Sequence, residues 1–72
     1  MSEQKFLSDL GKRIAAARRQ KGISQEKLAD AVDVHRTYVG FVEQGKRNPS
    51  IGKLRKIAKA VGLPLDKLFK GL

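Results

Sequence analysis

The sequence has 72 residues, with 16 lysines and arginines against 7 acidic residues, a formal net charge of +9 and no cysteine. A chain of this length supports one small domain, and without cysteine that domain has neither disulfides nor a cysteine-ligated metal site to stabilise it. The strong positive charge predicts a polyanionic partner, so nucleic acid and anionic membrane are the first candidates.

The first predicted helix covers about residues 3–21, and Gly22 ends it because glycine adopts the left-handed conformation at a helix C-terminus without strain. At helical spacing, its inner face carries Leu7, Leu10, Ile14 and Ala17. The N-terminal residues have mixed charge, and no apolar stretch approaches the ~20 residues that span a bilayer. We therefore expect neither a secretory signal nor a membrane partner, and we expect the chain in the cytoplasm.

Two short helices follow. Ser24 is a good N-cap for a second helix over residues 25–32, and a third helix covers residues 36–44, with Gly45 behind it as the C-terminal glycine.

Ser50 then caps a fourth helix over residues 51–61, which Gly62 ends, and Pro64 opens a last helical segment. The apolar residues of these last two helices, again at helical spacing, are Ile51, Leu54, Ile57, Ala58, Val61, Leu65, Leu68 and Phe69. The prediction is a single all-α domain of five short helices over residues 1–72.

The connection between the second and third helices is the most informative feature. It has only three residues, 33–35, and so short a turn sets the third helix steeply against the second, as in a helix-turn-helix unit whose second helix enters the DNA major groove. On the third helix, Val39 and Val42 face the second. The residues that point away from these valines are Arg36, Thr37, Gly40, Phe41 and Gln44. This outer face, in a unit over about residues 24–44, is the one that a groove would meet.

At this point the sequence resembles a known family, the lambda-repressor-like, Cro-type (XRE family) helix-turn-helix domains. The resemblance covers about residues 7–70. Its characteristic strings are Leu10-Gly11-Lys12-Arg13-Ile14, Gly22-Ile23-Ser24-Gln25-Glu26-Lys27-Leu28-Ala29 and Val42-Glu43-Gln44-Gly45-Lys46-Arg47-Asn48-Pro49-Ser50. Within the family, the segment Arg36-Thr37-Tyr38-Val39-Gly40 is most similar to the controller proteins of restriction-modification systems.

The resemblance implies a set of DNA contacts. The positions that face bases in the family are Arg36, Thr37, Gly40 and Phe41. Those that contact phosphates and sugars are Ser24 and Gln25 at the start of the second helix, and Gln44, Lys46, Arg47 and Asn48 after the third. It also implies an internal ion pair between Arg18 and Glu43, which belongs to the scaffold.

Several positions admit more than one interpretation. His35 is the N-cap of the third helix or a phosphate contact, and Tyr38 lies against the sugar-phosphate edge or covers the valines. Phe41, where relatives often carry a polar residue, contacts a thymine methyl group, packs on sugars or meets a protein partner. Asp33 stands where the family usually has glycine, so a strained or variant turn is expected. The cations outside the unit, which we expect to be solvated without individual contacts, include Lys12, Arg13, Arg19, Lys53, Arg55, Lys56 and Lys59.

The last segment is more apolar than a short terminal helix can bury beneath itself. We therefore predict that residues 50–72 supply part of the core and a twofold interface, formed by Leu65, Leu68, Phe69 and Leu72. One domain of this size rarely buries enough DNA surface for tight specific binding, whereas a dimer matches two half-sites about 34 Å apart.

Together these features predict a sequence-specific regulator of transcription that binds double-stranded DNA as a homodimer on a partly palindromic operator. No pair of acids flanks a pocket and no nucleophile has a neighbouring base, so we expect no enzymatic activity, no metal, no cofactor and no small-molecule ligand. Whether the regulator represses or activates depends on where its operator lies. Two alternatives remain at this stage, the antitoxin of a toxin–antitoxin pair and a protein-interaction module that has lost DNA binding.

Overall fold

A computed structural model describes residues 2–72 and contains, in this part of the chain, five helices and no strand. The helices are α1 (Glu3–Lys21), α2 (Gln25–Val32), α3 (Arg36–Glu43), α4 (Ile51–Val61) and α5 (Leu65–Phe69). The predicted all-α fold is therefore confirmed. One boundary differs by a residue, because Gln44 is the C-cap of α3 instead of its last residue.

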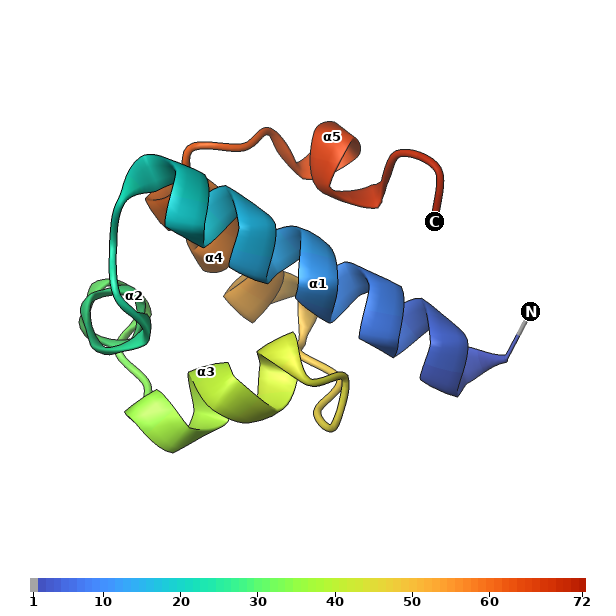
Figure 1. Ribbon diagram of the computed structural model, residues 1–72, viewed down its shortest axis with the longest axis horizontal. Coiled ribbons are helices and arrows are strands. Elements are labelled where there is room, and N and C mark those ends of the chain that lie inside the picture. Colours follow the sequence, from blue (N-terminus) through green and yellow to red (C-terminus); the bar gives the residue numbers. More distant parts are fainter. Residues whose placement is uncertain (1) are drawn as a thin grey trace.

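Helix α1 is the axis around which the other helices are arranged (Figure 1). Helices α3 and α5 lie on opposite sides of α1, and α4 lies behind it in this view. Helix α2 packs against both α3 and α4. No helix in the described residues is long and apolar enough to cross a membrane.

Local capping explains why the helices begin where they do. The hydroxyls of Ser2, Ser24 and Ser50 each accept a hydrogen bond from the backbone N–H three residues later, at 3.0–3.1 Å. Each cap satisfies one of the four N–H groups that a helix start leaves without a partner. The serine caps predicted for α2 and α4 are thus present.

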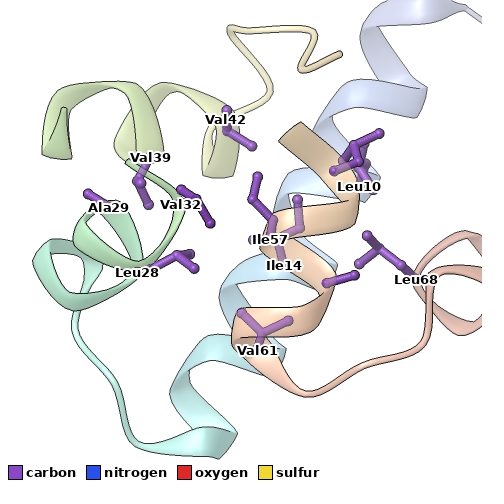
Figure 2. Packing of buried hydrophobic residues seen from close by; sticks show 12 residues of the cluster. Leu10, Ile14, Leu28, Ala29, Val32, Val39, Val42, Ile57, Val61 and Leu68 are labelled. Atoms are coloured by element: carbon purple, nitrogen blue, oxygen red, sulfur yellow. The ribbon is translucent and has the colours of Figure 1, made fainter. Parts of the chain in front are cut away.

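The core draws on all five helices and lies between α1, α4 and the α2–α3 pair (Figure 2). Its buried cluster comprises Leu10, Ile14, Leu28, Ala29, Val32, Val39, Val42, Leu54, Ile57, Ala58, Val61 and Leu68. Ile51, which the spacing puts on the apolar face of α4, is instead 61% exposed at the start of that helix. Burial of these apolar side chains is the main force that holds helices of this length together.

The position of α5 shows that one residue predicted at the twofold interface, Leu68, lies in the core. Leu68 is completely buried (Figure 2), so it belongs to the core of a single chain and cannot form an intermolecular surface. Leu65, Phe69 and Leu72 are only partly buried against the core. The sequence showed that α5 had excess apolar surface, but it did not show which of its residues would turn toward α1.

Two contacts fasten α5 to α1. The rings of Phe6 and Phe69 stack with their centroids 6.2 Å apart. Arg13 Nη1 donates hydrogen bonds to the backbone carbonyls of Lys67, at 3.2 Å, and Lys70. Arg13 therefore binds backbone carbonyl groups at and just after the end of α5, which corrects the prediction that it is merely solvated.

The turn between α2 and α3 forms with an aspartate in place of glycine. Asp33 adopts the left-handed conformation (φ 58°, ψ 49°), and the N–H of Val34 donates to the carbonyl of Ala29 at 3.0 Å. The turn conformation is therefore the one that a glycine would have given. Aspartate tolerates it better than most residues, although less readily than glycine.

Candidate nucleic-acid interface

The outer face of α3 is built as its valine spacing predicts. Val39 and Val42 are buried against the core, whereas Arg36, Thr37 and Phe41 are exposed. Since the two valines pack into the core, the opposite face of α3 is accessible to another molecule. Phe41, 37% exposed, is a large apolar side chain on that face and can cover the apolar edge of a base or sugar.

At the beginning of α3, His35 and Tyr38 both make contacts within the chain. His35 Nδ1 accepts a hydrogen bond from the backbone N–H of Thr37 at 3.1 Å, so His35 is the N-cap of α3. Tyr38 is partly buried against the core, which agrees with a side chain that covers the valines. Both residues therefore have a structural role within the chain.

After α3 the chain turns sharply and presents a cationic loop. Gly45 has a positive φ of 76°, and a Cβ at this position would lie 2.7 Å from Ser8 Cα of α1, so only glycine fits here. The N–H of Lys46 donates to the carbonyl of Phe41 at 2.8 Å. Beyond this turn Lys46, Arg47 and Asn48 are all exposed. The turn at Gly45 thus places the exposed side chains of Lys46 and Arg47 next to the outer face of α3.

A buried ion pair joins α1 to α3, as the family resemblance implied. Arg18 Nε donates to Glu43 Oε2 at 2.7 Å and Arg18 Nη2 to Glu43 Oε1 at 3.2 Å, a two-pronged contact with side chains 10% and 6% exposed. Arg18 Nη1 also donates to the carbonyl of Ile23 at 2.9 Å, just before α2 begins. One guanidinium therefore fixes α1, the start of α2 and the end of α3 relative to one another.

The start of α2 is attached to the same ion pair. Gln25 Nε2 donates to Glu43 Oε1 at 2.9 Å, and the hydroxyl of Ser24 is engaged in capping its own helix. The family resemblance implies a phosphate contact for both side chains. The structure shows that each already has a partner inside the protein, although the exposed N-terminus of α2 still favours an anion.

A hollow lies where α1, α2 and α3 meet, and the sequence interpretation did not anticipate it. Its volume is about 280 Å³, and the residues that line it are Lys12, Ala15 and Arg19 from α1, Gln25 from α2, and Gly40, Glu43 and Gln44 from α3 and its C-cap. The signal in the sequence was the spacing of Lys12, Ala15 and Arg19, which puts two cations and a small residue on one face of α1. That spacing alone could not show that this face borders α3.

Comparison with known proteins agrees with this geometry. The family model for the helix-turn-helix domain HTH_3 matches residues 14–68. The chain is 45% identical over 60 residues to control protein C.BamHI from Bacillus amyloliquefaciens, covering 81% of this chain and 74% of that protein. It is 36% identical over 59 residues to the HTH-type transcriptional regulator PuuR from Escherichia coli strain K12, covering 82% of this chain and 32% of PuuR.

Among solved structures, the chain is similar to the restriction-modification controller protein C.AhdI from Aeromonas hydrophila. The TM-score is 0.83 and the identity 41%, with 88% of this chain and 96% of that chain covered. The match therefore extends over nearly the whole of both molecules, including the helices on either side of the helix-turn-helix unit.

Proposed function

Because the chain belongs to the XRE-type helix-turn-helix family, a non-enzymatic family of DNA-binding transcriptional regulators, we propose that it binds specific double-stranded DNA sequences through α3. The observation that carries this proposal is the outer face of α3, where Arg36, Thr37 and Phe41 are exposed while the valines are buried. The cations that follow, Lys46 and Arg47, are exposed next to this face and would bind phosphates of the DNA backbone. Selection of bound sequences from a random pool of DNA duplexes tests the proposal and gives the site, its symmetry and its half-site spacing.

The affinity for duplex DNA should fall steeply with salt. Each phosphate that a lysine or arginine neutralises releases condensed counterions, so log K against log[NaCl] has a slope of about −0.9 per phosphate. Contacts from Lys46 and Arg47 alone therefore give a slope of about −1.8 for each chain bound. Fluorescence anisotropy over a series of NaCl concentrations measures this slope. A flat dependence would contradict the proposal.

Arg36→Ala should weaken binding to the selected site by about 1–3 kcal/mol and leave binding to unrelated duplexes nearly unchanged. The reason is that an arginine at this position donates two hydrogen bonds to the edge of a guanine, a contact that random sequence lacks. Arg55→Ala, on the exposed surface of α4, is the control of equal charge. Equal losses on specific and random DNA would reassign Arg36 to the phosphate backbone.

The active form that we propose is a homodimer on a partly palindromic operator, paired through apolar side chains of α5 and the residues after it that a single chain buries only in part. Leu65, Phe69 and Leu72 are partly buried and can contact a second copy without disturbing the core. Sedimentation should show dimer at tens of micromolar protein, with or without DNA. Monomer alone under both conditions would refute this arrangement.

Among the roles open to this family, we favour that of a restriction-modification controller acting in the cytoplasm at the nucleoid. The support is the similarity to C.BamHI and C.AhdI, whose names describe control proteins of this kind, together with the segment from Arg36 to Gly40. Disruption of the gene should change the transcription of a neighbouring restriction or methyltransferase gene. A copurifying toxin would instead favour an antitoxin.

A further inference from the structure

The hollow between α1, α2 and α3 has the composition of an anion site. Lys12 and Arg19 border it two helical turns apart on α1, with the small Ala15 between them. On the opposite wall, a Cβ on Gly40 would meet no other atom within 4 Å. Small residues on both walls thus leave about 280 Å³ of space between two cationic side chains. This space is several times the ~30 Å³ share of one water molecule, enough for a phosphate group.

The hollow is continuous with the surface proposed to meet DNA. Arg36, Gly40 and Gln44 are spaced by four residues and form one row along α3 and its C-cap, and the last two of them line the hollow. A duplex that contacts Arg36 would therefore bring its backbone past the opening between α3 and α1.

One acidic side chain lines the hollow and would repel an anion if its charge were free. Both oxygens of Glu43 are occupied, because Oε2 accepts from Arg18 and Oε1 accepts from Arg18 and Gln25. The Arg18 guanidinium balances the charge of Glu43, so the charges left at the hollow are those of Lys12 and Arg19. The nearest acid along α1, Asp9, is bound to Lys5 at 2.8 Å, and this hydrogen bond lowers the pKa of its carboxyl group.

The contact with Glu43 also orients the Gln25 amide. Because one hydrogen of Gln25 Nε2 is donated to Glu43 at 2.9 Å, its second hydrogen is available to another acceptor. The contact with Glu43 fixes the Gln25 side chain at the lining of the hollow, so less side-chain ordering remains to be done when a ligand binds.

We propose that this hollow receives one phosphate of the DNA backbone, held by Lys12 and Arg19 of α1 and by the amide of Gln25. The inference rests on the proposed function and adds α1 to the elements that contact DNA. It gives individual partners to two cations that the sequence interpretation left on a solvated face. Glu43 is then a positioning residue, which acts on the phosphate through Gln25.

The test compares two double variants of equal charge. Lys12→Gln/Arg19→Gln removes the cations of the hollow, and Arg55→Gln/Lys59→Gln removes one lysine and one arginine from the exposed surface of α4. Glutamine has a helix propensity close to those of lysine and arginine, so both variants should fold, which thermal unfolding verifies.

With the selected duplex, the hollow variant should bind at least about tenfold more weakly than the parent protein at 0.1 M NaCl. Its salt slope should be smaller by about 0.9 per chain bound, the value for one phosphate. The α4 variant should change the slope by less than half as much. Equal changes in the two variants would overturn the inference, because they would mean that these cations act only through the overall charge.

Failure of this inference can be told apart from failure of the proposed function. A parent protein with no salt-dependent affinity for duplex DNA would refute the function itself. A parent protein that binds as expected and responds to Arg36→Ala, but whose two double variants behave alike, would refute only the phosphate in the hollow.

A chemical substitution in the DNA identifies the phosphate directly. Neutral methylphosphonate groups replace single phosphates of the selected duplex one at a time. At one position in each half-site, the parent protein should lose affinity and the Lys12→Gln/Arg19→Gln variant should lose none, because its phosphate contact is already absent. If every position affects both proteins equally, no phosphate occupies the hollow.

Discussion

Replacing Glu43 with alanine should lower the free energy of unfolding by about 3–5 kcal/mol. The change leaves Arg18, 8% exposed, with its charge in the protein interior and with only the carbonyl of Ile23 as a partner. It also removes the hydrogen-bond partner of the Gln25 amide, so α1, the start of α2 and the end of α3 are no longer joined through Glu43. For a domain of this size each kilocalorie lowers Tm by roughly 4–8 °C, and the loss should be large enough to unfold much of the protein at 37 °C.

Thermal and urea unfolding followed by circular dichroism measure this effect. Glu26→Ala is the matched control, because Glu26 is an exposed acid of α2, and it should cost less than about 1 kcal/mol. Removing both partners, as Arg18→Met/Glu43→Leu, should recover much of the stability, since no charge then stays buried alone. A loss below about 1 kcal/mol for Glu43→Ala would show that water reaches the guanidinium.

The second large effect is expected at Gly11, where the backbone of α1 lies in close contact with the backbone of α3. A Cβ at this position would lie 2.5 Å from the carbonyl oxygen of Glu43 and 2.8 Å from its carbonyl carbon. These atoms are backbone, so they cannot move aside as the end of a side chain can. Gly11→Ala should therefore push the two helices apart and lower the free energy of unfolding by about 3 kcal/mol.

Gly40→Ala is the control for this prediction, because Gly40 is also a glycine within a helix. It has open space where the Cβ would go, so alanine should raise the free energy of unfolding by up to about 1 kcal/mol through its better helix propensity. The two substitutions are chemically identical and should have opposite signs in the same unfolding experiment. If Gly11→Ala also stabilised the protein, the close contact between α1 and α3 would be wrong.

Most of the fold could be predicted from the sequence because the local signals agree with one another. Serine caps, the glycines after α1 and α4, and apolar spacing all mark the same helix boundaries, and each acts over only a few residues. The outer face of α3 was predictable for the same reason, since Val39 and Val42 specify which side is buried.

The features that were missed depend on residues distant in sequence. Leu68 was assigned to an interface because its spacing shows that it lies on an apolar face, and only the docking of α5 on α1 shows that a single chain buries it. Arg13 meets the end of α5 across more than fifty residues of sequence. Lys12 and Arg19 border α3 because Gly11 lets the two helices approach, and local spacing cannot show where two helices cross.

The separation of the two faces of α3 has a consequence for how such regulators diversify. The side chains that hold α3 in place, Val39 and Val42, are distinct from Arg36, Thr37 and Phe41, which extend into solvent. Substitutions at exposed positions of this kind usually change the free energy of unfolding by less than about 0.5 kcal/mol. Under the proposed function, a new operator preference can therefore arise by single amino-acid replacements, each of which leaves a folded and testable intermediate. The same property makes α3 a suitable place to build libraries that select altered DNA specificity.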